Sequence, residues 1–347
     1  MTTIARVAQE AGVGVGTVSR VINGSTAVSE ATRRRVLEVV AELGYEPNAT
    51  ARALSTGRTR AVGVIAPFFT RPSVMERLRG LAPVLAASGY QLILFDVENA
   101  EQREAAFRSP IGRVDGLISI SLAPTRTELA RLRAADVALV LVDQAHERLP
   151  SVLVDDVEGG RIATHHLLEL GHTRIAFAGD TVDEVHGASA SYRRCVGYQR
   201  ALADAGMTPP PELVKVRPHG DDASVIAADL LALDEPPTAV FAASDLQALA
   251  MIDAITALGR RVPDDLSVVG FDDVELARYA GLTTVAQPLE VSGSRGAELL
   301  LSALEGTESS GPSQHLPLEL VVRGTTAAPC DAETAARTAA GKEPGVA

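Results

Sequence analysis

Two pairs of adjacent aspartates, Asp155-Asp156 and Asp272-Asp273, are the residues of this chain best suited to chemistry. Paired carboxylates can act as general acid and base, or they can hold a metal ion. Their usual companions are missing, because the chain has no Ser-His-Asp order, no histidines at metal-ligand spacing and no activated cysteine. The same carboxylates can accept hydrogen bonds from the vicinal hydroxyls of a sugar. We therefore predict a binding cleft and no enzyme, metal or cofactor.

The glycine-rich stretch GVGVGT at residues 12–17 has two possible uses. A dinucleotide-binding loop needs its glycines directly after a strand, with a third glycine at the position that Thr17 occupies. A helix-turn-helix needs a small residue in its first helix, a glycine in the turn and an apolar residue in the second helix. Ala8, Gly12 and Val18 meet this need at separations of four and six. The stretch predicts a helix-turn-helix, with an ordinary helical hairpin as the alternative.

The composition, with 46% hydrophobic and 3% aromatic residues in a chain of 347, is typical of an α/β protein with more than one domain. The net charge is −12, but the first sixty residues contain eight arginines against five glutamates and no aspartate. That segment carries +3 and the remainder −15, so only the N-terminal segment suits nucleic acid. No apolar run approaches the roughly 18 residues of a membrane span, so we expect a cytoplasmic protein. Cys195 and Cys330 match neither a disulfide nor a zinc pattern.

The elements that must position these residues change type along the chain. Three short helices are predicted over Ile4–Ala11, Gly14–Val21 and from a cap at Ser29 to Leu43. The Ala-rich residues 48–60 predict a helix too short to be stable alone, followed by a linker. Beyond them, β-branched runs alternate with helical patterns, which predicts parallel sheets covered on both faces and two similar lobes. The strands are expected at 61–67, 91–97, 115–121, 137–144, 174–180, 239–245 and 266–273.

Several longer motifs resemble the lactose/galactose-repressor (LacI/GalR) family of bacterial transcription regulators, and the likeness runs from Thr2 to about Thr325. The motifs are TVSRVING at 17–24, the stretch 28–59, LLELGHTRIAFAGD at 167–180, PPTAVFAASDLQAL at 236–249 and VPDDLSVVGFDD at 262–273. The resemblance implies a homodimer in which all-α helix-turn-helix heads bind a pseudo-palindromic operator. It also implies a core like a periplasmic sugar-binding protein, with two doubly wound parallel-sheet lobes.

The expected domain limits follow from this resemblance and from the patterns above. They are a head at 1–47, a hinge helix and linker at 48–60, a core at 61–325 and a disordered tail at 326–347. Within the core, the N-terminal lobe is expected at about 61–159 plus 289–318, and the C-terminal lobe at about 160–288 plus 319–325.

By the same resemblance, the second helix reads DNA bases and the hinge helix enters the minor groove. The implied DNA-binding residues are Val15, Gly16, Thr17, Arg20, Asn23, Tyr45, Asn48, Ala51 and Leu54. Arg20 suits a bidentate contact to guanine, and Leu54 matches a leucine that wedges into a base step. Because Val15 and Gly16 lack hydrogen-bonding side chains, we expect base readout to depend on Arg20 and on a methyl contact from Val15.

The resemblance further implies a small-molecule effector between the lobes of the core. The implied effector-binding residues are Phe69, Arg71, Asp143, Ser191, Arg194, Asp245, Asp272 and Gln287. Two alternatives remain open, since Arg194 can be a solvated helix residue and Asp245 can cap the helix that follows it. Purine-binding members place aromatics where this chain has Ser73 and Val74, so a purine effector would lose its stacking contact.

These observations predict a repressor whose operator affinity falls when a sugar or glycoside closes the cleft. Co-repressor logic remains open, as does a sugar receptor or an enzyme with the same core fold. Members that dock a phosphorylated carrier protein use a basic residue where this chain has Glu298, so we do not expect that partner. The tail has no leucine heptad, so we expect a dimer rather than a tetramer.

Overall fold

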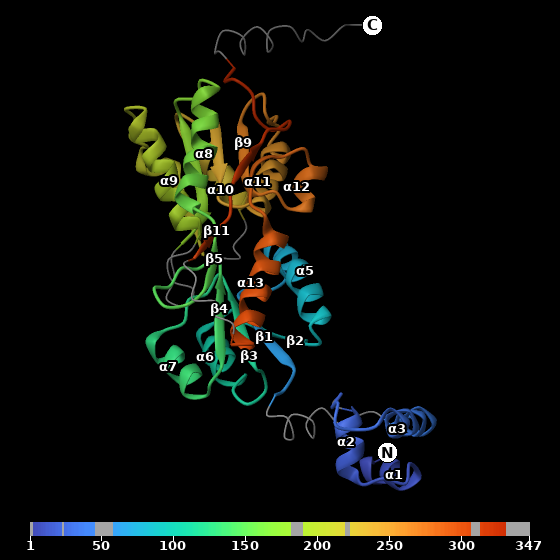
Figure 1. Ribbon diagram of the computed structural model, residues 1–347. Helices are drawn as coiled ribbons and strands as arrows, with labels where there is room; N and C mark the ends of the chain where they lie inside the picture. Colours follow the sequence, from blue (N-terminus) through green and yellow to red (C-terminus); the bar gives the residue numbers. More distant parts are fainter. Residues whose placement is uncertain are drawn as a thin grey trace, which may run out of the picture. The chain divides into compact units, whose positions relative to one another are not determined.

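The chain divides between Arg60 and Ala61 into two compact units, a helical head and an α/β core (Figure 1). The computed structural model describes residues 3–22, 24–45, 58–181, 190–218, 223–306 and 313–330. The predicted fold class is confirmed, with a helical head and two parallel-sheet lobes in the core. In the described part of the chain, no helix is long and apolar enough to cross a membrane.

The head contains three helices packed around a small apolar core: α1 (Ile4–Glu10), α2 (Val15–Ile22) and α3 (Glu30–Glu42). The Thr3 side chain accepts a hydrogen bond from the Arg6 N–H at the start of α1, and Ser29 caps α3 in the same way. Gly12 has a φ of +62°, which allows the sharp turn into α2 at low cost. The apolar core is formed by Val7, Ala8, Ala11, Val18, Val21 and Val36.

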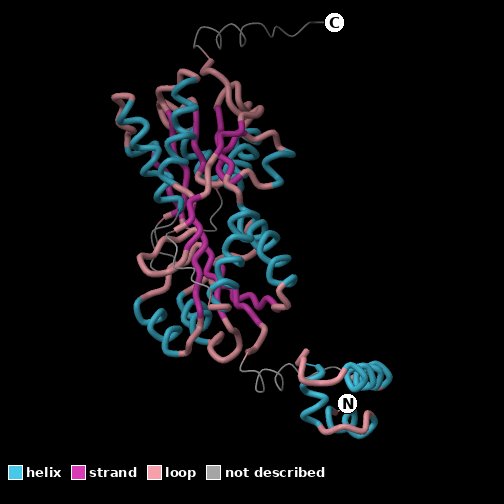
Figure 2. Tube along the Cα trace, viewed as in Figure 1, coloured by secondary structure: helices cyan, strands magenta, loops and turns pink. Residues whose placement is uncertain are grey.

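Each lobe of the core contains one sheet, whose strands are magenta in Figure 2. Each sheet has six strands, and the two sheets share one strand order. The N-terminal sheet has the order β11-β5-β4-β3-β1-β2, and the C-terminal sheet has the order β12-β10-β9-β8-β6-β7. The N-terminal strands are β1 (Ala61–Ala66), β2 (Gln91–Asp96), β3 (Gly116–Ile120), β4 (Ala138–Val142), β5 (Ser151–Leu153) and β11 (Gln314–His315). The C-terminal strands are β6 (Ile175–Asp180), β7 (Val214–Arg217), β8 (Ala239–Ala242), β9 (Ser267–Asp272), β10 (Thr283–Ala286) and β12 (Glu319–Val321).

All seven predicted strands are present, as β1 to β4, β6, β8 and β9. The remaining five, β5, β7, β10, β11 and β12, were not predicted, and each has only two to four residues. Strand pairing is parallel throughout the described sheets except between β10 and β12. Since parallel strands end at the same edge, the carboxyl ends of both sheets can build one site.

Helices cover both sheets, and the chain passes from one lobe to the other just before two of them, α8 and α13. The N-terminal lobe holds α5 (Pro72–Ala87), α6 (Ala100–Arg108), α7 (Arg126–Ala134) and α13 (Leu289–Leu304). The C-terminal lobe holds α8 (Asp156–Glu169), α9 (Ala190–Asp204), η1 (Pro211–Leu213), α10 (Ser224–Leu231), α11 (Asp245–Ala257) and α12 (Glu275–Tyr279). Helix α8 follows β5 of the N-terminal lobe but packs on α9 of the C-terminal lobe. Conversely, α13 follows β10 of the C-terminal lobe but packs on α5 of the N-terminal lobe. The lobe boundary expected at 159 therefore falls inside α8.

One helix crossing in each lobe brings two backbones into direct contact. A Cβ atom on Gly160 of α8 would lie 2.1 Å from the carbonyl oxygen of Arg194 in α9. A Cβ atom on Gly293 of α13 would lie 2.0 Å from the carbonyl oxygen of Arg77 in α5. Because such distances leave no room for a side chain, glycine at both crossings fixes where the two arginines lie.

The C-terminal lobe includes residues that the sequence assigned to the tail, so the expected core limit at 325 is too early. Thr326 Oγ1 lies 3.0 Å from His166 Nε2, and the Ala327 carbonyl oxygen lies 2.8 Å from His172 Nε2. The Ala327 N–H also donates to the Ser267 hydroxyl. Burial lowers the pKa of both histidines, which keeps them neutral in these contacts. The rest of the expected tail, residues 331–347, lies outside the described residues.

We expect Gly160→Ala to destabilise the core by about 1–3 kcal/mol, because the added methyl group must push α8 away from α9. The matched control is Gly324→Ala, whose Cβ would meet the Gly281 carbonyl oxygen at an ordinary 3.7 Å. Urea unfolding followed by circular dichroism measures both variants. Equal stability of the two would contradict the proposed role of the helix crossing.

Candidate functional site

A cavity of about 130 Å³ lies between the two lobes, at the carboxyl ends of strands from both sheets. A single water needs only about 10–15 Å³, so the cavity has room for a small organic molecule. Within the described residues, the charged groups that line it are three arginines and three aspartates: Arg71, Arg77, Arg194, Asp143, Asp180 and Asp272. Hydroxyl groups come from Ser73, Ser121, Thr181, Ser191 and Ser244, and Phe68 supplies an aromatic ring.

Each lobe contributes one buried arginine–aspartate pair to the cavity. Arg77 Nη2 in α5 lies 3.5 Å from a carboxylate oxygen of Asp143, which follows β4. Arg194 Nη1 in α9 lies 3.6 Å from a carboxylate oxygen of Asp272, which ends β9. The first strand of each sheet leads into the helix that carries the arginine, and both sheets have one strand order. The two pairs are therefore equivalent members of an internal repeat.

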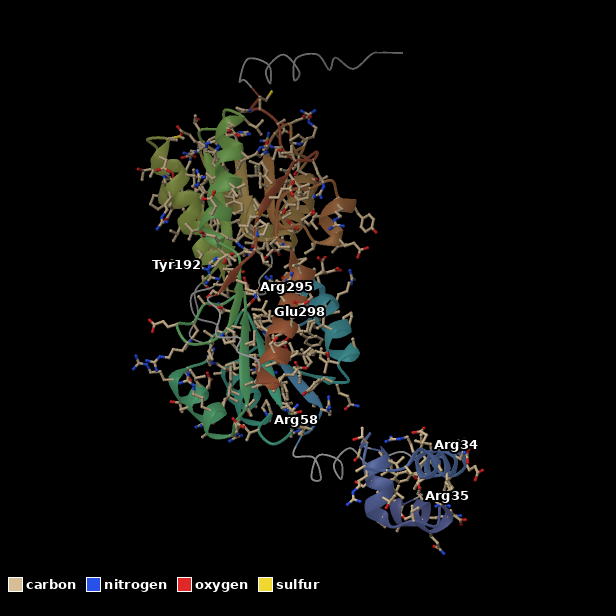
Figure 3. All side chains as sticks on the ribbon, in the orientation of Figure 1. Arg34, Arg35, Arg58, Tyr192, Arg295 and Glu298 are labelled. Atoms are coloured by element: carbon tan, nitrogen blue, oxygen red, sulfur yellow. The ribbon has the colours of Figure 1, made fainter. Side chains whose placement is uncertain are left out.

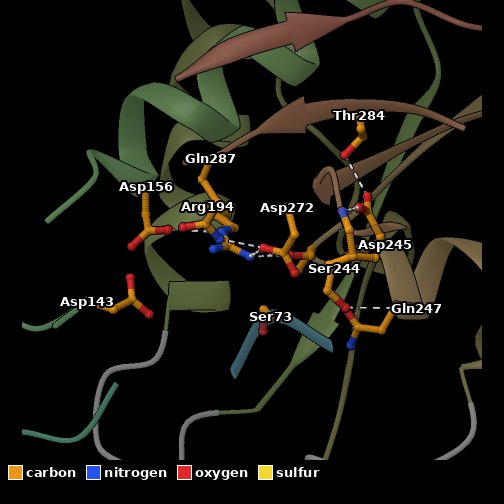
Figure 4. Close-up of polar contacts among 12 residues, drawn as sticks. Ser73, Asp143, Asp156, Arg194, Ser244, Asp245, Gln247, Asp272, Thr284 and Gln287 are labelled. Carbon is orange, nitrogen blue, oxygen red and sulfur yellow. Dashed lines mark hydrogen bonds and ion pairs between the residues drawn. The ribbon is translucent and has the colours of Figure 1, made fainter. Parts of the chain in front are cut away.

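Gln287, between β10 and α13, connects these two pairs. Its side-chain NH₂ donates to Asp272 at 2.6 Å, and its side-chain carbonyl accepts from Arg77 Nη2 at 3.0 Å. Figure 4 shows Gln287 and Asp272 beside Arg194. A continuous polar connection thus joins the N-terminal lobe to the C-terminal lobe through one crossover of the chain.

Asp156, the first residue of α8, holds Arg194 from the side away from Asp272 (Figure 4). Its buried carboxylate accepts from Arg194 Nε at 2.9 Å and from Arg193 Nε at 2.9 Å. Arg194 Nη1 donates to the Ala243 carbonyl oxygen at 2.6 Å, and the guanidinium lies 3.6 Å from the centre of the Phe271 ring. These contacts leave Arg194 one orientation, with its outer edge toward Asp272 and the cavity.

Among the described residues, the N-terminal lobe has no carboxylate at the position that matches Asp156. Leu289 begins α13 where Asp156 begins α8, and each residue stands four positions before the crossing glycine of its helix. Arg77 Nε accordingly has no hydrogen-bond partner in the described part of the chain. The two lobes therefore repeat the arginine–aspartate pair but support it differently.

The surroundings shift the two aspartates of these pairs in opposite directions. Burial raises the pKa of Asp272, although the charges of Arg194 and Arg77 and the Gln287 side chain act against it. Burial alone would raise the pKa of Asp143, but the charges of Arg77 and Arg193 and the Ser121 hydroxyl outweigh it, so the pKa lies below its usual value. Burial opposes the charge on Arg194, yet nearby Asp156, Asp272 and Asp143 carboxylates raise its pKa. An ionised carboxylate can accept about four hydrogen bonds, more than the described contacts supply. Acceptor positions therefore remain for a ligand.

The head presents the predicted base-reading residues on one exposed face of α2. Val15, Gly16 and Arg20 are exposed, whereas Val18 and Val21 of the same helix are buried. A Cβ atom on Gly16 would meet nothing within 4 Å, so this position is open. Thr17 and Tyr45 are partly buried. The predicted residues Asn23, Asn48, Ala51 and Leu54 lie outside the described residues.

Exposed arginines add positive charge to the head. Arg34 and Arg35 of α3 extend into solvent, as Figure 3 shows. Figure 3 also labels Glu298 on α13, which accepts a hydrogen bond from Arg295 at 2.7 Å. The charge at position 298 is therefore already paired on its own helix.

Comparison with known proteins assigns both units. Residues 3–48 match the model of bacterial regulatory proteins of the lacI family, and residues 164–326 match a periplasmic binding protein-like domain. The "HTH-type transcriptional repressor PurR" of Vibrio atlanticus (strain LGP32) is 34% identical over 334 residues, covering 94% of this chain and 98% of its own. The chain belongs to the LacI family.

Two solved structures of LacI-family regulators match the same share of the chain as this PurR relative does. A "transcriptional regulator CelR-cellobiose complex" is 35% identical and matches with a TM-score of 0.69, covering 94% of this chain and all of its own. A lac repressor dimer bound to operator and the anti-inducer ONPF is 28% identical with a TM-score of 0.81, covering 94% and 99%. These relatives are regulators rather than enzymes, and among the described residues no group of three or more potential metal ligands occurs.

In this LacI-family core, six of the eight predicted effector residues line the cavity: Arg71, Asp143, Ser191, Arg194, Asp272 and Gln287. Phe69 and Asp245 are not among the lining residues, and a role for either in effector binding stays a prediction. Phe68 has a left-handed φ of 49°, and Phe68 rather than Phe69 reaches the cavity wall. Phe69 instead packs against the core of the N-terminal lobe.

Asp245 is fully buried and does not line the cavity. Its carboxylate accepts from the Val274 N–H at 2.9 Å and from the Thr284 hydroxyl at 2.5 Å (Figure 4). Nor does it cap α11, because the Ser244 side chain accepts that hydrogen bond from Gln247. Burial, with the nearby charge of Asp272, raises the pKa of Asp245 to about 7.

The sequence prediction missed Arg77, the arginine of the N-terminal lobe. A signal was present, because Arg-x-x-Gly occurs at residues 77–80 and again at 194–197, on the helix that follows the first strand of each sheet. Without the strand order of both sheets, a four-residue pattern with two defined positions carries little weight. Asp156 was noticed as half of an acidic pair, but its contact with Arg194 depends on the crossing of α8 and α9.

The raised pKa of Asp245 predicts a pH-dependent stability. Its protonated form suits the folded state, so the stability it contributes is present below about pH 4 and is lost as the pH rises through about 7. The side chain of Asp245→Asn carries no charge, and its oxygen can accept from the Val274 N–H while its NH₂ donates to the Thr284 hydroxyl. The variant should therefore gain roughly 2–3 kcal/mol of stability relative to the wild type between pH 5 and pH 8. Urea unfolding at both pH values measures this difference.

Asp264→Asn, at an exposed carboxylate, is the control for that measurement. A pH-independent difference between Asp245→Asn and the wild type would show that the buried carboxyl does not titrate in this range.

Proposed function

We propose that this chain is a transcriptional repressor that binds operator DNA through its head and releases it when a sugar or glycoside binds between the lobes. The observation that carries the ligand half of this proposal is the equivalent arginine–aspartate pair from each lobe. A ligand that bonds to both pairs stabilises one relative arrangement of the lobes. Ligand binding can then act at a distance as a shift between two states.

The chemistry of the cavity favours a polyhydroxylated ligand. The carboxyl oxygens of Asp143 and Asp272 can accept hydrogen bonds from adjacent hydroxyls, and the arginines and serines can donate to ring or glycosidic oxygens. Phe68 offers one apolar surface. Support also comes from the CelR relative, whose structure contains cellobiose.

The exposed face of α2 supports the DNA half of the proposal. Arg20 offers two parallel N–H donors for a guanine edge, and Val15 offers methyl groups for a thymine. The open position at Gly16 would contribute no hydrogen bond. Asn23 and Tyr45 would contact phosphates, whereas Asn48, Ala51 and Leu54 would belong to a hinge segment that enters the minor groove.

We propose a homodimer, because two heads suit a pseudo-palindromic operator. A lac repressor relative was solved as a dimer on its operator. Large apolar side chains remain exposed on the core, among them Leu246, Leu276 and Tyr279, and such side chains suit a subunit interface. The opposite sign of control, in which the ligand strengthens operator binding, remains the second candidate.

The ligand half is tested by thermal unfolding of the full chain with cellobiose and a panel of mono- and disaccharides. We expect at least one sugar to raise the melting temperature of the wild type, because a ligand of the folded state stabilises it. Asp272→Asn should weaken that sugar by about 10- to 100-fold, the loss of a charged hydrogen bond. Asp264→Asn is the control at an exposed site, and equal affinity in the two variants would discard the pocket.

The DNA half is tested on duplexes selected from a random pool by the wild-type protein. We expect Arg20→Ala to weaken binding to the selected site by about 10- to 100-fold and to relax the preference at one base pair per half-site. The control, Arg133→Ala, removes an exposed arginine from α7 in the core and should leave affinity unchanged. Uniform weakening on all sequences would assign Arg20 to phosphate contact instead.

A further inference from the structure

We infer that Arg193 and Glu76 are latch residues, which lie outside the cavity, reach from one lobe to the other and set how far the cleft opens. Each residue directly precedes the pocket arginine of its lobe, Arg194 or Arg77. Only one part of the inference rests on the proposed function, namely that the latch residues adjust the response to the effector. The contacts themselves are independent of any ligand.

Arg193 connects the C-terminal lobe to the N-terminal lobe. Its guanidinium holds Asp156 through Nε at 2.9 Å and Nη2 at 2.8 Å, both within the C-terminal lobe. Nη2 also donates to the backbone carbonyl oxygen of Asp143, in the N-terminal lobe, over a longer 3.5 Å. The positive charge of Arg193 further helps to lower the pKa of Asp143. Opening the cleft would have to break this contact.

Glu76 makes the reverse connection, from the N-terminal lobe to the C-terminal lobe. Its Oε1 accepts a hydrogen bond from the Glu275 N–H at 3.0 Å. Glu275 is the first residue of α12, whose N-cap, Val274, has no side-chain hydrogen bond to offer. The first N–H groups of a helix have no partner within the helix, so a carboxylate from the other lobe stabilises this one.

The internal repeat makes the two latches equivalent. Arg193 and Glu76 stand at the same position of the helix that follows the first strand of each sheet, four residues before a crossing glycine, Gly197 or Gly80. Each reaches the segment that follows the equivalent strand of the other lobe, β4 or β9. The same position of the repeat thus carries an arginine in one lobe and a glutamate in the other, and each side chain contacts the opposite lobe.

Neither residue lines the cavity between the lobes, so neither is assigned to the ligand. Breaking a latch should free the lobes without removing a ligand contact. The signature of a latch is therefore a disturbance in the lobe that does not contain the changed residue. A purely local role would disturb only its own lobe.

Hydrogen exchange measured by mass spectrometry on the ligand-free, full-length protein tests this directly. We expect Arg193→Gln to speed exchange about three- to tenfold in N-terminal-lobe peptides around residues 143–152, the scale of one lost hydrogen bond. We expect Glu76→Ala to speed exchange similarly in C-terminal-lobe peptides around residues 273–280. The controls are Arg161→Gln on α8 and Arg79→Gln on α5, which carry exposed ion pairs inside their own lobes.

A third variant separates the latch from local support of Arg194. Arg193→Lys keeps a positive charge for Asp156, but a single ammonium cannot reach both Asp156 and the Asp143 carbonyl as the forked guanidinium does. Exchange should rise around residues 143–152 and remain unchanged around Asp156. This variant also decides the matter if Arg193→Gln loses its native circular dichroism.

Exchange that rises only in the lobe carrying the substitution, or that rises equally in the controls, would overturn the latch. Because this experiment needs no sugar, its result stands apart from the proposed function. That function fails separately, if no sugar shifts the melting temperature of the wild type.

Discussion

Two arginine side chains, Arg77 and Arg194, are buried at the boundary between the lobes, and polar groups packed around them replace the water that they lose. Removing a guanidinium from water costs several kcal/mol unless carboxylates and carbonyls replace the lost hydration. Arg194 receives this replacement from Asp156, Asp272 and the Ala243 carbonyl, whereas Arg77 receives it from Asp143 and Gln287. The charged groups that could bind an effector are thus part of the structure that joins the lobes.

This arrangement depends on helix crossings that tolerate no side chain. Gly160 and Gly293 allow α8 and α13 to lie against the carbonyls of the two arginines. Because both helices have crossed from the other lobe, the crossings also tie the connection between lobes to the position of the charges. A ligand that pulls on one arginine–aspartate pair therefore acts on the helices that link the lobes, which is a physical route from the cavity to the relative position of the lobes.

The sequence predicted features that depend on local pattern. The cap at Ser29, the turn at Gly12 and the long apolar strands follow from residues close together in the chain, and the structure confirms them. The family resemblance added six residues that line the cavity. It could not show that Phe68 rather than Phe69 lines the cavity, because that depends on the left-handed backbone of Phe68 in the turn after β1.

Contacts between residues far apart in the chain could not be predicted from the sequence. Asp245 follows a strand, as a ligand-binding aspartate would. Its carboxylate instead accepts hydrogen bonds from Val274 and Thr284, which lie 29 and 39 residues away in the sequence. Arg77 and Asp156 gain their meaning only when the two lobes are compared.

The central claim is that the cavity and the head share one two-state element. By linkage, an effector that lowers operator affinity must itself bind the operator complex more weakly by the same factor. The direct measurement is calorimetric titration of the active sugar into the full-length protein, once free and once saturated with its selected operator. We predict dissociation constants that differ by about 5- to 150-fold, the usual range of such coupling. Equal constants would contradict the account, because the sugar site and the DNA site would then be independent.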